Sequence, residues 1–426
     1  MGRPAHSRPL DGPVCERPSR DAAVIAGWCR GVAPNGAELW YEMVRFVGTV
    51  ITDINPFVYS HPIAPDDVID RDEETERLLT AAVGGHYVRL YAPRKYGKTS
   101  LLRRVLRDAE RREQMIPVLV DLYGVLSIAD VAIRFERAYA RQLKGKLRAR
   151  IEEFLQSTGL GLSLGALGVS ARLQIDPRTD PLPALHALLD LPLRLEEGGG
   201  FRALIVLDEF QDVTKVKEMD ALLRSHIQFQ GEVASFVFAG SEPGLMRELF
   251  EDRERPLYGQ AVPMRLERLA DADISSYIAG RFRESGRSVG DALNPLAAAA
   301  QGHPQRAMLL AHRLWEEVAS DGTATLADWT RAHAAALVEL QPEFDANWRR
   351  LPTSSQKALR AVVAGDGSPF QRRVLEQLDL PKSTARAALR SLVANATVEQ
   401  KDDEYRVIDP LFAEWIARLR QTGDAG

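Results

Sequence analysis

The stretch that decides the fold is Tyr91–Leu102, with the sequence YAPRKYGKTSLL. An apolar run, Tyr87–Tyr91, leads into it, and a helix-like stretch begins at Ser100. A phosphate-binding loop has this order of strand, tight turn and helix, because backbone N–H groups of the turn and of the helix N-terminus point at phosphate oxygens. The stretch therefore predicts a nucleotide-binding loop. Its expected members are Ala92, Pro93, Arg94, Lys95, Tyr96, Gly97, Lys98, Thr99 and Ser100.

Two side chains of the loop have expected chemical roles. Lys98 would neutralise the β- and γ-phosphates of a nucleotide, and the Thr99 hydroxyl would ligate Mg²⁺. The loop departs from the pattern G-x-x-x-x-G-K-[ST] at one position, because Ala92 stands where the first Gly is expected. Since Ala is the smallest substitute, we expect a slightly strained loop rather than a lost one.

An acidic pair supplies the second half of the predicted site. Ala203–Leu207 is a continuous apolar run of strand length, typical of a strand buried on both faces of a parallel sheet, and it ends in Asp208 and Glu209. Asp208 would hold the Mg²⁺ shell beside the phosphate loop. Glu209 would orient and deprotonate a water for attack on the γ-phosphate. The alternative, a pair that merely ends a strand at the solvent, is disfavoured by the upstream loop and by strand–helix alternation.

A third apolar run, Ala234–Ala239, ends in Gly240 and Ser241, and the Ser241 hydroxyl would hydrogen-bond the γ-phosphate or the attacking water. These three segments, in this order, resemble the AAA+ ATPases. The resemblance is greatest for a prokaryotic subgroup near the STAND and origin-initiator-like ATPases. That subgroup has a loop ending in YGKTSL, a strand ending in DEFQ and a Gly-Ser sensor, and the resemblance spans residues 65–420.

The resemblance implies an α/β fold class: an AAA+ P-loop NTPase core with a parallel sheet, a helical lid and a C-terminal winged-helix domain. It also implies ATP and Mg²⁺ as cofactors, with Ser241 at the position called sensor 1. The expected boundaries are residues 56–270 for the ATPase core, 271–345 for the lid and 350–420 for the winged helix. Residues 1–55, whose first part is rich in Pro, Gly and Arg, are expected to be a disordered extension.

Further site residues are implied by the same resemblance. Ile69 and Arg71 would contact the base or the ribose, although a helix N-terminus rich in Asp and Glu explains the same segment. Arg253 and Arg255 lie where such proteins carry an arginine that reaches the γ-phosphate of the next subunit. The alternative for these two arginines is that they are ordinary solvated charges in a loop.

The lid is expected to contribute one arginine to the site. Gly302-His303-Pro304, followed by a long helix-like stretch, resembles the Gly-x-Pro element of STAND-type lids. This likeness puts Arg306 near the position called sensor 2, where a lid arginine touches the nucleotide. We interpret His303 as a turn residue rather than a catalyst, because Glu209 already supplies the base.

The last unit has the element order of a winged helix. Helix-like segments cover Ser354–Ala364, Pro369–Leu378 and Lys382–Ala394, and a predicted hairpin with a charged tip follows. Lys382, Arg386 and Arg390 are spaced i, i+4 and i+8, so they would share one exposed helix face that could meet DNA. From position 349 onward the unit has 13 basic and 10 acidic side chains, so a protein partner or self-association remains the alternative to DNA.

Composition excludes several classes of protein. The 426-residue chain has a net charge of −4, so no global charge demands a nucleic acid or an anionic membrane. Both cysteines, Cys15 and Cys29, lie near the start, which leaves the rest without a disulfide framework or a thiolate metal site. No apolar run reaches the roughly 18 residues needed to span a bilayer. We therefore expect a cytoplasmic protein without a membrane partner.

One segment between the phosphate loop and the Ala203–Leu207 run has a different pattern. Apolar residues alternate over residues 159–176 in two runs around Gly165 and Ala166, which favours a hairpin. It is either a structural insert or a contact loop for a partner or neighbouring subunit.

These features leave three candidate functions. The preferred one is an ATP-binding and ATP-hydrolysing switch that repositions the winged helix. The second is a DNA-binding regulator that holds ATP with negligible hydrolysis, but a mere binder would not need Glu209. A nucleotide kinase is disfavoured, because the sensor strand and the C-terminal unit have no place in it.

Overall fold

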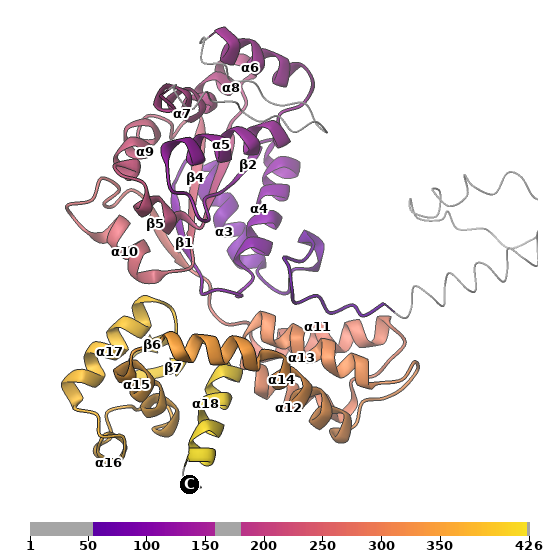
Figure 1. The fold of residues 1–426 in the computed structure, drawn as a ribbon. Coiled ribbons are helices and arrows are strands. Elements are labelled where there is room, and N and C mark those ends of the chain that lie inside the picture. The colour runs from indigo at the N-terminus through magenta and orange to yellow at the C-terminus, as the bar shows by residue number, and fades with distance from the viewer. Residues whose placement is uncertain (1–53, 158–179, 424–426) are drawn as a thin grey trace, which may run out of the picture. The chain divides into compact units, whose positions relative to one another are not determined.

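A five-stranded parallel sheet forms the centre of the N-terminal half in the computed structural model, which describes residues 54–157 and 180–423. The strand order is β2-β3-β4-β1-β5 (Figure 1). The strands are β1 (Val88–Tyr91), β2 (Ile116–Asp121), β3 (Ala203–Asp208), β4 (Ala234–Gly240) and β5 (Val262–Arg265). Because β4 lies between β1 and β3, the ends of the three predicted site strands are neighbours.

The interior strand β3 is buried on both faces, as its continuous apolar sequence predicts. Ala203, Ile205 and Leu207 contribute to the core on one face, while Leu204 and Val206 contribute to the core on the other. This alternation follows from the period of two along a strand. A pairing shift of one residue would exchange the two faces, so packing fixes the register that places Asp208 at the strand end.

Helices connect the parallel strands and cover the two faces of the sheet (Figure 1). One face packs against α3 and α4, and the other packs against α5, α7 and α9. The helices of this half are α3 (Asp72–Val83), α4 (Lys98–Glu113), α5 (Ile128–Gln142), α6 (Gly145–Ser157), α7 (Leu182–Leu189), α8 (Leu191–Gly199), α9 (Met219–Ile227) and α10 (Pro243–Glu251).

The chain after β5 is mostly helical. Four helices form the part predicted as a lid: α11 (Asp271–Glu284), α12 (Leu293–Ala300), α13 (Pro304–Glu317) and α14 (Leu326–Arg350). The remainder, which we call the C-terminal unit, contains α15 (Thr353–Ala364), α16 (Arg372–Gln377), α17 (Lys382–Ala394), the antiparallel pair β6 (Val398–Lys401) and β7 (Glu404–Val407), and α18 (Pro410–Gly423). Three helices followed by a hairpin is the order that the sequence predicts.

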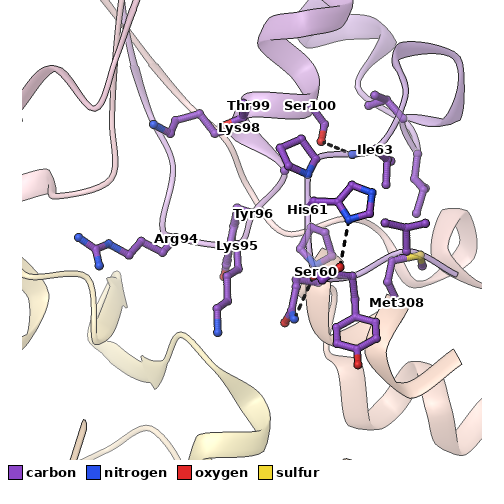
Figure 2. A pocket seen from close by; sticks show the side chains of 18 of the residues that line it. Ser60, His61, Ile63, Arg94, Lys95, Tyr96, Lys98, Thr99, Ser100 and Met308 are labelled. Atoms are coloured by element: carbon purple, nitrogen blue, oxygen red, sulfur yellow. Dashed lines mark hydrogen bonds between the residues drawn. The ribbon is translucent and has the colours of Figure 1, made fainter. Parts of the chain in front are cut away.

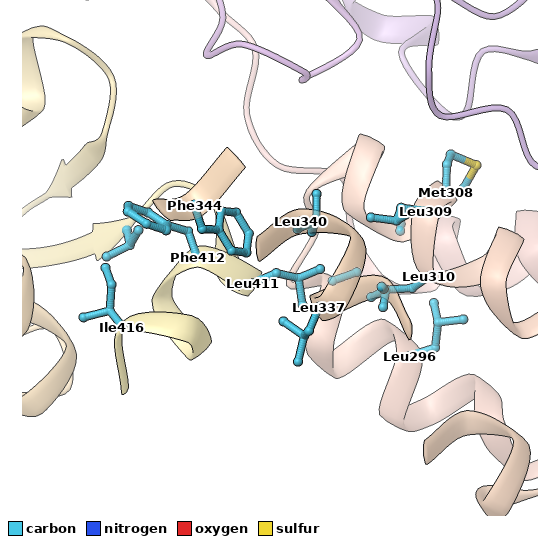
Figure 3. Packing of buried hydrophobic residues seen from close by; sticks show 14 of the residues in the cluster. Leu296, Met308, Leu309, Leu310, Leu337, Leu340, Phe344, Leu411, Phe412 and Ile416 are labelled. Atoms are coloured by element: carbon cyan, nitrogen blue, oxygen red, sulfur yellow. The ribbon is translucent and has the colours of Figure 1, made fainter. Parts of the chain in front are cut away.

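The lid helices and the C-terminal unit share one hydrophobic core. Figure 3 shows Leu340 and Phe344 of α14 near Leu411 and Phe412 of α18. The rings of Phe344 and Phe412 have centroids 5.2 Å apart. These contacts explain why α14 continues past Pro342 to Arg350.

Pro342 lies inside α14, where its missing N–H and its ring normally end or kink a helix. Burial of Phe344, which is 1% exposed, and the contact of Trp348 with Phe412 oppose that tendency. Tertiary packing therefore overrides the local tendency of Pro342 to end the helix.

Two predicted segments cannot be compared with the structure. The hairpin at residues 159–176 and nearly all of the N-terminal extension, residues 1–55, lie outside the described residues. Among the helices that the structure does describe, none combines the length and the apolar character needed to cross a bilayer.

Candidate nucleotide-binding site

The phosphate loop lies between β1 and α4, where its sequence predicts it. Gly97 has a φ of 80° and caps the N-terminus of α4, which begins at Lys98. This left-handed conformation favours glycine. Lys95 also adopts a positive φ, 68°, although it carries a side chain. The loop is therefore conformationally strained at Lys95 and relaxed at Gly97.

Ala92, which replaces the first glycine of the motif, is fully buried. Its backbone N–H donates to the Gly240 carbonyl at 3.2 Å, which ties the loop to the end of β4. Ala92 is not among the described non-glycine residues with positive φ. The positive φ of the loop therefore lies at Lys95 and Gly97 and not at Ala92.

The two halves of the predicted site meet at Lys98. Its Nζ forms a short ion pair with Asp208 and lies 3.0 Å from Glu209 Oε1. Thr99 Oγ1 donates a hydrogen bond to Asp208 Oδ2 at 3.1 Å. Lys98 and Asp208 are each 6% exposed, so the charges are buried together and compensate one another.

Glu209 is held from two further sides. The Ser241 hydroxyl donates to Glu209 Oε2 at 2.7 Å, and Gln211 Nε2 donates to the same oxygen at 2.6 Å. Burial raises the pKa of the Glu209 carboxyl, but the charge of Lys98 and these hydrogen bonds outweigh it, and the net pKa is lowered. Glu209 is therefore an ionised carboxylate at neutral pH.

Gln211 is a site residue to which the sequence reasoning gave no role. It is 1% exposed, and its Oε1 accepts from the Ser241 backbone N–H at 3.3 Å. A Cβ at Gly240 would lie 2.8 Å from that Oε1 and 2.5 Å from Met246 Sδ. Glycine at the end of β4 thus permits the close approach of Gln211. The stretch DEFQ, which carries Gln211 two residues after Glu209, was the available signal.

A magnesium ion fits the donor set of this site. Thr99 Oγ1 and the Asp208 carboxylate supply two adjacent oxygen ligands, the type that Mg²⁺ prefers. Among the described residues no cluster of three or more His, Cys, Asp or Glu side chains forms an all-protein metal site.

A cavity of about 410 Å³ adjoins the loop (Figure 2). This volume lies in the range of small-molecule sites, roughly 300–1,000 Å³. In Figure 2 Lys95 and Lys98 project from the loop in different directions. The lining includes loop residues Pro93–Ser100, Glu209, residues Val58–Ile63, Ile69 and Arg71, and Pro304, Gln305 and Met308 of α13.

Segment Val58–Ile63 forms one wall of the cavity and was missed by the sequence reasoning. Its Ile63 backbone N–H donates to Ser100 Oγ at 3.2 Å, which attaches the segment to the start of α4. The segment contains no periodic pattern or motif, so no local signal could have identified it.

Ile69 and Arg71, the residues expected to contact the base or the ribose, both line the cavity. Arg71 is buried, and its guanidinium donates to Glu74 at 2.6 Å and to the Glu267 carbonyl at 2.7 Å. Asp70, which directly precedes Arg71, adopts a φ of 48°. Asp tolerates this left-handed conformation better than most side chains, which explains how the segment keeps its turn.

Arg306 does not line the cavity, although it is the residue predicted at sensor 2. It is fully buried, and its Nε lies 3.0 Å from each carboxylate oxygen of Asp409. His303 is a turn residue, as interpreted from the sequence, and its Nδ1 accepts from the Arg306 backbone N–H at 3.4 Å. Burial lowers the pKa of His303 to about 3, so this imidazole is neutral at pH 7.

The two arginines near α10 lie in different environments. Arg255 binds Asp220 at 3.2 Å and forms a shorter ion pair with Glu248. Arg253 is exposed and has no hydrogen bond or ion pair with any residue that the structure describes. Neither arginine lines the cavity of its own chain.

Comparison with known proteins gives likeness of fold. No protein-family model matches the chain, and no curated protein matches it. The solved structure of a Walker-type ATPase of Pyrococcus abyssi has 20% identity and a TM-score of 0.61, over 85% of this chain and 99% of that one. The Aeropyrum pernix ORC2 protein, solved in ADPNP–ADP complexes, has 16% identity and a TM-score of 0.53, over 87% and 99%. The chain thus has the α/β fold of AAA+ P-loop ATPases.

Proposed function

We propose that this protein binds ATP with Mg²⁺, hydrolyses it, and acts as a switch whose output is the C-terminal unit. The observation that carries the proposal is the position of Glu209. This ionised carboxylate lies beside the phosphate loop and is oriented by Lys98, Ser241 and Gln211. A protein that merely holds a nucleotide has no need of a positioned base at this point.

The residues of the site divide the chemistry among them. Lys98 and the N–H groups at the start of α4 would neutralise phosphate oxygens. Thr99 and Asp208 would hold Mg²⁺, which supplies charge neutralisation for the transferring phosphoryl group when bound. A phosphate anion near Lys98 competes with Glu209 for that ammonium, which leaves Glu209 free to accept a proton from water. Ser241 and Gln211 keep the carboxylate oriented.

Conversion of Glu209 to Gln tests the proposal. Glu209→Gln should retain ATP binding and lower hydrolysis by roughly 100-fold or more, because the amide cannot accept the proton. Binding is measured with a fluorescent ATP analogue, and turnover by phosphate release. Glu76→Gln, which breaks an exposed pair with Arg112, is the matched control and should leave both unchanged.

The alternative function, an ATP-liganded DNA-binding regulator, predicts another result. Wild-type protein would bind ATP, release no phosphate above background, and show no effect of Glu209→Gln on turnover. Equal loss of binding and turnover in the variant would instead assign Glu209 a structural role.

Two finer features belong to the same proposal. The C-terminal unit would act as a winged helix, with DNA as the partner favoured by the exposed Lys382, Arg386 and Arg390 of α17. Arg253, which is exposed, would reach the γ-phosphate bound by a neighbouring copy. Arg255 is less suited to that role, because Asp220 and Glu248 already bind it.

A further inference from the structure

Four charged side chains of alternating sign connect the phosphate loop with the C-terminal unit. Lys95 Nζ lies 2.6 Å from Glu343 Oε1 of α14. The same oxygen lies 3.7 Å from Arg306 Nη2 of α13. Arg306 binds Asp409, which precedes α18. Glu343 is therefore the only described side chain that contacts both the loop cation and the buried lid cation in this series.

The ion pairs at the two ends of this series differ in solvent exposure and therefore in how easily each pair can be broken. The side chains of Lys95 and Glu343 are 39% and 42% exposed, so their pair is screened by water and weak. The Arg306 side chain is fully buried, and its bond to Asp409 is geometrically complete. A change in charge at the nucleotide cavity, which Lys95 lines, would therefore act first on the Lys95–Glu343 pair.

Asp409 connects Arg306 with the N-terminus of α18, because it binds both. Its Oδ1 accepts hydrogen bonds from the backbone N–H groups of Leu411 at 3.1 Å and Phe412 at 3.3 Å. These groups are free donors of the first helical turn, so the carboxylate caps the helix. Burial raises the pKa of the Asp409 carboxyl, but Arg306 outweighs it and the net pKa is lowered, which keeps the cap ionised.

We propose that Glu343 competes with nucleotide phosphate for Lys95 and thereby reports occupancy of the loop to α18; this inference rests on the proposed ATP binding. A phosphate anion on the loop draws Lys95 away from Glu343. Arg306 is then the nearest cation to Glu343, and stronger pairing between them weakens the hold of Arg306 on Asp409. The cap of α18 loosens as a result. Because such coupling is reciprocal, the Lys95–Glu343 pair also opposes nucleotide binding.

Glu343→Gln tests the competition directly. The variant should bind ATP about two- to fivefold more tightly than the wild type, the effect of removing one exposed ion pair. Asp345→Asn is the matched control, because Asp345 lies on the same helix and pairs with Arg349, away from the loop. Its ATP affinity should equal that of the wild type. Titration with a fluorescent ATP analogue measures the affinity of the wild type, Glu343→Gln and Asp345→Asn.

The outcomes separate this inference from the proposed function. Failure of all three proteins to bind the analogue would overturn the proposed function itself. Binding by the wild type with equal affinity in Glu343→Gln would overturn the competition and leave the proposed function standing. Equal tightening in Asp345→Asn and Glu343→Gln would also overturn it, because general charge removal would then explain the effect.

Amide hydrogen exchange measures the transmission to α18. In the wild type, ATP should speed exchange at Leu411 and Phe412, whose N–H groups the Asp409 carboxylate binds. In Glu343→Gln, ATP should leave these two rates unchanged. An equal response of both proteins would show that occupancy reaches α18 without Glu343 and would overturn the inference.

Discussion

Lys98 shows how a single buried residue joins sequence-distant halves of a site. Its ammonium binds Asp208 and Glu209, which follow it by more than a hundred positions. Lys98→Ala should weaken ATP binding by about 100-fold or more, because charge-assisted hydrogen bonds contribute about 1.5–3 kcal/mol each. Lys217→Ala, at an exposed lysine outside the cavity, is the control. Wild-type affinity in Lys98→Ala, measured by analogue titration, would contradict the assignment of the phosphate loop.

The predicted site residues that the structure brings together all lie at strand ends of one sheet, whereas the contacts of Arg306 lie elsewhere. The loop, Asp208–Glu209 and Ser241 come together because each ends or follows a strand of one parallel sheet, and the carboxyl ends of parallel strands meet at one edge. Arg306 was assigned to the nucleotide on the basis of position alone. Its actual partner, Asp409, lies about a quarter of the chain away, and no periodicity in the sequence connects the two.

At the scale of elements, α17 carries a basic surface that the sequence predicts well. Lys382, Arg386 and Arg390 are exposed, whereas Leu389 and Leu392 on the other face are each 1% exposed. Helical periodicity fixes this division, because only one face can enter the core. By contrast, the length of α14 could not be predicted. Pro342 favours an earlier end, and the opposing contacts come from α18.

The basic face of α17 makes a test of DNA contact possible. Replacing Lys382, Arg386 and Arg390 together by Ala should weaken DNA binding several-fold and lower the log–log salt slope by at most about three. ATP hydrolysis without DNA should be unchanged. Fluorescence anisotropy across a salt series measures the DNA affinity and its salt slope, and phosphate release measures hydrolysis. Arg372→Ala on α16 serves as the control. If the wild type fails to bind DNA at about 50 mM salt, the C-terminal unit is a protein-contact module.

At the scale of the whole described molecule, Arg306 and Asp409 join the lid helices to the C-terminal unit. Asp409→Asn should destabilise the fold by about 3–5 kcal/mol, because it leaves a buried guanidinium without its anion. Glu376→Gln, which breaks an exposed pair with Arg372, should change stability by less than about 1 kcal/mol. Urea denaturation measures the free energy of unfolding of both variants. A loss below about 1 kcal/mol in Asp409→Asn would contradict the assigned role.

The pH dependence of the same pair has a definite sign. The pKa of Asp409 is lowered in the folded state, so the unfolded chain binds a proton at higher pH than the folded one. The pair therefore stabilises the fold above the unfolded value of about 4, and this contribution is lost as pH falls through the folded pKa. At pH values below about 4, the urea midpoint of the wild type should decrease with falling pH more steeply than that of Asp409→Asn.

The continuous helix α14 limits how this protein can be dissected. Its C-terminal half carries Phe344 and Trp348, whose partners Phe412 and Trp415 belong to α18. A truncation at the apparent lid boundary near residue 345 would cut the helix and expose one side of that aromatic cluster to water. Such a fragment would tend to self-associate through the exposed aromatic side chains, so its behaviour would not represent that of the N-terminal half in the whole chain. The roles of the two halves are therefore better separated by point substitutions that leave α14 intact than by deletion of the C-terminal unit.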